Sequence, residues 1–346
     1  MRKRYFIFVV ALLLTGPVLA TVPFAVGLDP YRVFGLSGYN DRNFAPNTRY
    51  LKTEYLLAHP EVDAFVLGSS RVNYYDVASL QQITGHAWYN LNVSAETAEG
   101  LLNRVRWLTA NRKVRRLFIG LDYDFMFQVK RIRDDDYLRM EHPALRGTRL
   151  SFVWRQLQVP YREMVTAIEM IGVRDVEHYG LNLETGHYRR PARDDLMRRF
   201  PEEYARNLDT SVTPRRTAAH PWHLAAFDEL VALLKERSVE AVFVINPVHA
   251  TRIRHFKPDE YGDWLRHLAT SGAEVWDFSG YNPVTTDNHL YYENSHFTRR
   301  VGDLVLGRAL GALKPEMLPD GFGVRLTPEV VGERVRQLVV RYRPVT

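Results

Sequence analysis

Two short stretches of the sequence carry the side chains that serine-based acyl transfer uses. Ser70 stands in a Gly-Ser-Ser-Arg turn directly after an apolar run, and Glu293 precedes His296 by three residues near the other end of the chain. A hydroxyl is a weak nucleophile until a base takes its proton, and a carboxylate can fix the tautomer of that base. Ser70, His296 and Glu293 are therefore the candidate nucleophile, base and orienting acid. The same residues have ordinary alternatives, a serine helix cap and a surface-loop histidine.

Polar residues also follow three further apolar runs. Asn92, Asp122 and Asn246 stand where these runs end, and Arg71 follows the candidate nucleophile. Such residues can line the cleft and an oxyanion site, although Asn and Asp also favour turns at strand ends. Arg71 is expected to pair with Asp122 or to supply positive charge. Asp277, at the end of another apolar run, is an alternative orienting acid.

The predicted strands and helices that carry these residues alternate along the chain. Short apolar runs predict buried strands at residues 63–68, 87–93, 116–122, 240–246 and 274–278. Apolar periodicity predicts helices at residues 76–83, 95–111, 223–236, 258–270, 298–313 and 328–341. Alternation of this kind predicts an α/β fold, a three-layer sandwich with a mainly parallel sheet. In such sheets ligands bind at the carboxyl ends of the strands, where the candidate residues lie.

The alternation divides the chain into a core and additions. Residues 29–123 and 221–315 are expected to form the α/β domain, after an irregular lead-in at 29–60. Residues 124–220 interrupt it as an Arg-rich helical insertion or lid, with helical pieces near 151–172 and 194–207, and residues 316–346 form a helical tail. The arginines of the insertion are either a solvated face or a surface for an anionic or sugar polymer.

The N-terminus predicts a membrane segment. After Met1-Arg2-Lys3-Arg4, residues 5–28 contain no charged side chain, which is long enough for a transmembrane helix. The basic residues in front place the N-terminus inside and the main domain outside the cytoplasm. We therefore expect residues 1–28 to be an inner-membrane anchor or uncleaved signal, with a periplasmic domain behind it. The alternative is a signal peptide cleaved after residues 18–20.

Composition limits the chemistry. The chain has 346 residues, no cysteine and a formal net charge of +6. Without cysteine, a thiolate nucleophile, a disulfide and a Cys-ligated metal are excluded. No histidine spacing matches a zinc signature, so no metal or other cofactor is expected. The positive charge is spread along the chain, which argues against nucleic acid as a partner.

The order of these blocks resembles the SGNH hydrolase superfamily, with its serine after the first strand and its acid-x-x-His block near the C-terminus. The chain looks most like membrane-anchored, extracytoplasmic members, similar to the proteins of teichoic acid D-alanylation and alginate O-acetylation. The resemblance implies that the N–H groups of Ser70 and Asn92 line the oxyanion hole. The family has Asp, Gly and Asn where this chain has Glu293, Asn92 and Asp122.

The resemblance implies an esterase or O-acyltransferase that modifies a cell-envelope or exported polysaccharide through an acyl-serine intermediate. A transferase would receive its acyl group from a donor protein in the membrane. Because Asp122 would repel an oxyanion, we also expect as an alternative a catalytically inactive relative that binds polysaccharide or scaffolds an assembly complex. A solute-binding or sensor domain is the third reading.

Overall fold

The computed structural model describes residues 29–35, 46–128, 137–158, 180–211 and 218–341, with single residues and short runs between 5 and 27 and between 160 and 169. They belong to two compact units. One comprises Met1–Leu57, Arg133–Leu181 and Arg189–Pro191, and the other comprises Ala58–Ile132, Asn182–Tyr188 and Ala192–Thr346. Residues 124–220, expected as one insertion, are therefore divided between the two units.

The first unit contains helices α3 (Thr48–Ala58) and α6 (Arg149–Gln156). The prediction of an irregular lead-in was wrong for α3. The side chain of Asn47 accepts a hydrogen bond from the N–H of Tyr50 at 3.1 Å, which caps the start of this helix. The Tyr50 ring stacks on Phe152 of α6 with centroids 4.9 Å apart, so the two helices share an aromatic contact.

The second unit is built on a six-stranded sheet with the order β10-β7-β6-β3-β1-β2. The strands predicted from the apolar runs are present as β1 (Ala64–Leu67), β2 (Trp88–Asn90), β3 (Arg116–Leu121), β6 (Glu240–Ile245) and β7 (Val275–Asp277). Their pairings are all parallel. Strand β2 lies on one side of β1, whereas β3 and the later strands lie on the other side. The carboxyl ends of β1 and β3 therefore form a topological switch point.

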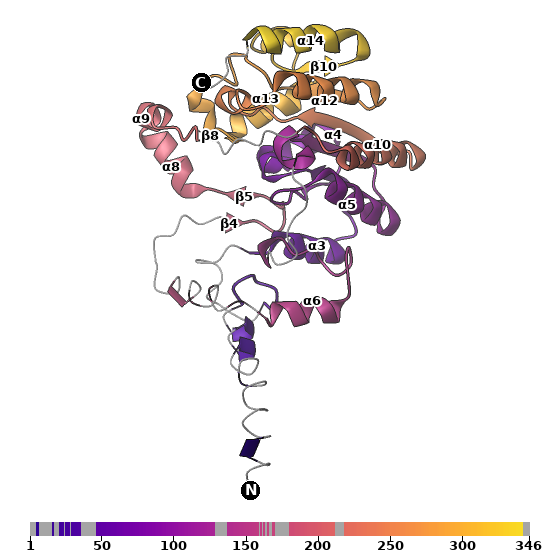
Figure 1. The fold of residues 1–346 in the computed structure, drawn as a ribbon, viewed down its shortest axis with the longest axis vertical. Helices are drawn as coiled ribbons and strands as arrows, with labels where there is room; N and C mark the ends of the chain where they lie inside the picture. The colour runs from indigo at the N-terminus through magenta and orange to yellow at the C-terminus, as the bar shows by residue number, and fades with distance from the viewer. Residues whose placement is uncertain are drawn as a thin grey trace. The chain divides into compact units, whose positions relative to one another are not determined.

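Helices cover both faces of this sheet (Figure 1). Because side chains alternate along a strand, Val242 and Val244 of β6 face one way and Phe243 faces the other. The two valines belong to the core that contains Leu80 of α4 (Val77–Thr84) and Val305 of α13 (Arg299–Ala309).

The opposite face of the sheet is covered by α10 (Pro221–Glu236), whose Phe227 ring meets Phe243 of β6 at 5.4 Å. Helix α5 (Ala98–Asn111) packs on α10, and α12 (Pro258–Thr270) lies on the same face through Trp264 and Phe127. The α/β prediction is confirmed, and the arrangement is compatible with three layers.

The C-terminal segment also joins the sheet. Strand β10 (Val324–Leu326) pairs antiparallel with β7, and α14 (Pro328–Arg341) packs on α12. The helix was predicted, but the strand was not, because a three-residue edge strand has too few side chains to show an apolar pattern. The piece expected as one helix near 194–207 is two helices, α8 (Pro191–Arg199) and α9 (Pro201–Arg206). Pro201 separates them because it has no N–H and disfavours helical backbone at the residue before it.

No helix within the described part of the chain has the length and apolar character needed to cross a membrane. Most of residues 1–28 lies outside the described residues, so the N-terminal anchor stays a prediction.

Candidate active site

The candidate nucleophile lies in a tight turn at the carboxyl end of β1. Gly68 has a φ of 141°, and a Cβ atom there would come within 2.8 Å of the Gly120 carbonyl oxygen. Only glycine avoids this contact, so the backbone can turn sharply beside β3. A 3₁₀ turn, η1 (Ser70–Tyr74), begins directly afterwards, with Ser69 as its cap. The turn places Ser70 at the strand end, where the sequence predicted it.

The candidate base lies in a short hairpin formed by β8 (Tyr291–Glu293) and β9 (His296–Phe297). One carboxylate oxygen of Glu293 is hydrogen bonded to Nδ1 of His296, and the other accepts the N–H of Ser295 at 2.8 Å. A carboxylate can only accept, so Nδ1 carries the proton of a neutral imidazole and Nε2 is left as an acceptor. Glu293 therefore fixes both the tautomer of the base and the turn that carries it.

The structure brings the candidate nucleophile and the candidate base together at the carboxyl edge of the sheet. Ser70 Oγ lies 2.7 Å from His296 Nε2, although 226 positions separate the two residues in the chain. The side chains of His296 and Glu293 are 15% and 19% exposed, so this Ser-His-Glu array is open to a substrate rather than sealed in the core. Tyr74 meets the His296 ring edge-on at 6.2 Å and stacks on Tyr292, which limits how the imidazole can tilt.

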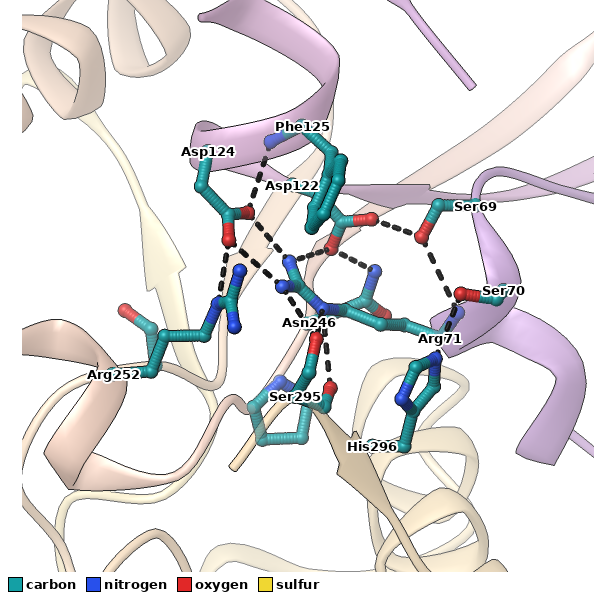
Figure 2. Close-up of polar contacts among 12 residues, drawn as sticks. Ser69, Ser70, Arg71, Asp122, Asp124, Phe125, Asn246, Arg252, Ser295 and His296 are labelled. Atoms are coloured by element: carbon teal, nitrogen blue, oxygen red, sulfur yellow. Dashed lines mark hydrogen bonds and ion pairs between the residues drawn. The ribbon is translucent and has the colours of Figure 1, made fainter. Parts of the chain in front are cut away.

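Arg71 connects the nucleophile turn with the base hairpin (Figure 2). Its Nε donates to the Ser295 carbonyl at 3.1 Å, directly before His296. The two terminal nitrogens of the same guanidinium bind Asp124 at 2.8 and 2.9 Å, and one of them is also 2.8 Å from Asp122. Arg252 binds Asp124 from the other side at 2.6 Å. The predicted pairing of Arg71 with Asp122 is confirmed, and it belongs to a larger buried network.

The charges of this network determine its protonation. Burial by itself raises the pKa of the Asp124 carboxyl, but the attraction of Arg71 and Arg252 outweighs it and holds this pKa well below its usual range. Burial lowers the pKa of Arg71, whereas its attraction to Asp122 and Asp124 raises it above its ordinary value. The guanidinium and the Asp124 carboxylate are therefore both ionised at neutral pH.

Asp122 and Asn246 are occupied within the protein. Asp122 accepts hydrogen bonds from Ser69 Oγ and, at 2.8 Å, from the Asn246 side chain (Figure 2). The amide oxygen of Asn246 in turn accepts the Tyr75 hydroxyl at 2.6 Å. Both residues lie at the predicted strand ends, but these hydrogen bonds hold the ends of β1 and β3 together rather than facing a developing oxyanion. The side chain of Asp122 is fully buried and is paired with Arg71, which offsets the repulsion expected of a carboxylate in this position.

The predicted oxyanion role of Asn92 needs correction. Its backbone N–H donates to the side-chain oxygen of Asn90 at 3.1 Å, so this donor is directed into the protein. Asn90 also donates to the Val72 carbonyl at 2.8 Å, which ties the end of β2 to η1. The Asn90 side chain therefore binds both Asn92 and Val72. In the turn after β2, the Asn92 N–H points to Asn90 and not to a substrate. Of the two predicted oxyanion donors, the Ser70 N–H remains.

Asp277 does not orient the base. It is fully buried and binds Arg334 of α14 at 2.7 Å, and it accepts both the N–H and the hydroxyl of Ser279. Its strand lies two positions away from β3 in the sheet, so it is bound by the C-terminal helix instead. Glu293 is therefore the acid at His296. Among the described residues, no three His, Asp or Glu side chains are grouped to hold a metal ion.

Sequence reasoning missed Ser69, Asp124, Arg252 and Ser295, which complete the network around Arg71. Two signals were present: an Asp-x-Asp pair after the third strand, and a second serine directly before the candidate base. Neither pattern distinguishes a buried ionic network from ordinary turn residues. Arg252 gave no signal, because only the fold brings α11 (Ala250–Ile253) beside the turn that follows β3.

No protein-family model matches this sequence, and no curated protein matches it either. The functional argument therefore rests on the residues and their geometry.

Proposed function

We propose that this chain is a serine esterase or O-acyltransferase of the SGNH type, which modifies a cell-envelope or exported polysaccharide through an acyl-Ser70 intermediate. The observation that supports it best is the 2.7 Å contact between Ser70 Oγ and His296 Nε2, with Glu293 on the other ring nitrogen. This contact lies at the switch point of the parallel sheet, and α/β proteins of this strand order bind ligands there. The same order is found in flavodoxin-like sheets, which supports the three-layer assignment.

In the proposed reaction His296 removes the hydroxyl proton as Ser70 Oγ attacks the acyl carbonyl carbon. The tetrahedral intermediate then collapses to the acyl-serine, and His296 returns the proton to the leaving alcohol. Water or a sugar hydroxyl, deprotonated by the same imidazole, attacks the acyl-serine in the second half and frees Ser70. Glu293 stabilises the imidazolium formed in each half.

The substrate class follows from the predicted location. The predicted anchor at residues 1–28, with basic residues in front, would place the site in the periplasm, where a polysaccharide of the cell envelope is a candidate substrate. A transferase working there needs an activated acyl group, so we propose a membrane donor protein as its partner. The net charge of +6 favours an anionic polymer over a cationic one.

Labelling of the full chain with a fluorophosphonate probe in detergent tests the enzyme proposal. We expect the wild type to be labelled, and Ser70→Ala and His296→Ala to lose the label. Ser238→Ala, which alters an exposed serine of the same unit, is the matched control and should label like the wild type. Undiminished labelling of Ser70→Ala would refute the assignment of the nucleophile.

A second candidate function is glycan binding or scaffolding without catalysis. The specific observation in its favour is the loss of an oxyanion donor: the Asn92 N–H is bonded to Asn90, and the Asn246 amide is bonded to Asp122. Loss of one such donor costs about 10²–10³ in rate. This candidate predicts no labelling of folded wild-type protein, together with polysaccharide binding that is unchanged in Ser70→Ala.

A further inference from the structure

Helix α6 in the first unit presents apolar side chains on two sides. Its Phe152 is buried and stacks on Tyr50 of α3, so one side is used for packing within the unit. Leu150 and Trp154 stand four positions apart and are 81% and 53% exposed. Side chains at this spacing lie next to each other on a helix. The two residues thus form one apolar surface in addition to the face that the fold already buries.

The segment that contains this pair is basic, between Glu141 and Glu163. Residues 142–162 include four arginines and no aspartate or glutamate. All four arginines are exposed: Arg146, Arg149, Arg155 and Arg162. A short helix with Leu and Trp on one side and arginines beside them is the pattern of a helix that lies in the interface of an anionic membrane. Each basic residue near such a surface adds to the attraction.

The position of α6 in the first unit gives an independent reason for this partner. Leu157, directly after α6, packs against a small cluster formed by Ala25 and Tyr31. Ala25 belongs to the uncharged stretch of residues 5–28 that the sequence predicts as a membrane anchor. The C-terminal end of α6 is therefore beside the point where this stretch ends, which is the depth of the lipid headgroups when the anchor spans a bilayer.

We propose that α6 is an interfacial membrane helix. Leu150 and Trp154 insert among the headgroups and upper acyl chains of an anionic bilayer, and Arg149 and Arg155 bind lipid phosphates. Tryptophan is suited to this position, because its ring is apolar and its N–H can reach water or a headgroup. The first unit would then be held to the membrane at two points, the predicted anchor and α6. This inference is independent of the chemistry proposed for Ser70.

Site-specific spin labels on the full chain test this proposal. Because the chain has no cysteine, Leu150→Cys and Trp154→Cys each provide a single labelling site. Val340→Cys is the matched control, since Val340 is also an apolar helical residue and is 83% exposed on α14. The labelled proteins are reconstituted in vesicles of phosphatidylglycerol and phosphatidylcholine. Collisions of the label with oxygen, which concentrates in lipid, are compared with collisions with a water-soluble nickel complex.

We expect the ratio of oxygen to nickel collisions at positions 150 and 154 to rise well above the ratio at position 340. Adding Arg149→Glu and Arg155→Glu to Leu150→Cys should lower the ratio at position 150. Ratios at 150 and 154 equal to that at 340 would show a water-exposed surface and overturn the proposal. Low collision rates with both reagents would show that a protein covers α6, which would overturn it as well. Charge-reversal variants with an unchanged ratio would overturn the role of the arginines.

Discussion

Replacement of Arg71 by methionine is the sharpest test of the network beneath the site. The Arg71 side chain is 2% exposed and contacts two buried carboxylates and the residue before the candidate base. Methionine fills a similar volume but removes the charge. Asp124 keeps its bond to Arg252, whereas Asp122 loses the guanidinium that it is paired with. Removing one partner of a buried pair costs about 3–5 kcal/mol, and we expect Arg71→Met to be destabilised by that amount.

A double-mutant cycle separates this charge effect from lost packing. In Asp122→Asn the amide keeps the shape, and Arg71 still binds Asp124, so we expect a loss of only about 1–2 kcal/mol. The double variant Arg71→Met/Asp122→Asn no longer contains the uncompensated carboxylate. It should therefore be more stable than the sum of the two single losses by about 1–3 kcal/mol.

Urea unfolding of the full chain in mild detergent, followed by tryptophan fluorescence, measures these losses. Labelling with the fluorophosphonate probe is measured in parallel, because Arg71 also holds Ser295 beside His296. We expect Arg71→Met to label more slowly than the wild type at urea concentrations where both are folded. Strict additivity of the two substitutions, or a loss below about 1 kcal/mol in Arg71→Met, would show that the buried charge pair does not stabilise this turn.

Three further outcomes follow from the geometry. Glu293→Gln keeps the size of the side chain but removes the charge that fixes the His296 tautomer, so the labelling rate should fall by about 10²–10⁴, and an unchanged rate would exclude Glu293 from the reaction. Gly68→Ala should cost about 1–3 kcal/mol in thermal unfolding, because the new Cβ meets backbone at 2.8 Å. Gly85→Ala also has positive φ but open space around its Cβ, so a loss as large as that of Gly68→Ala would argue against the clash. Because the pKa of Asp124 is lower in the folded protein than in the unfolded chain, its ionised form stabilises the fold fully when the pH is above the unfolded pKa of about 4. This stabilisation is lost as the pH falls from there toward the folded pKa. The stability difference between wild type and Asp124→Asn should accordingly narrow below about pH 4, and a constant difference would contradict this linkage.

Much of the architecture could be predicted because it depends on local patterns. Each parallel strand is buried on both faces and is therefore a continuous apolar run, and each covering helix repeats its apolar residues at helical spacing. Helix α3 and strand β10 escaped the prediction for different reasons. Asn47 caps α3 but stands among turn-forming residues, so it did not indicate a helix start. Strand β10 has only three residues, too few to show an apolar pattern.

The residue types and their order could be predicted from the amino-acid sequence alone: Ser70 after the first strand, and Glu293 and His296 after the last parallel one. Which of the other polar residues lie in the site depends on how the chain folds. Hydrogen-bond donors are directional, so the backbone turn at Asn92 aims its N–H at Asn90 whatever the residue type suggests. Buried charges must find partners wherever packing brings them, and this joins Arg71 to Asp122 and Asp124 across more than 50 positions of the chain.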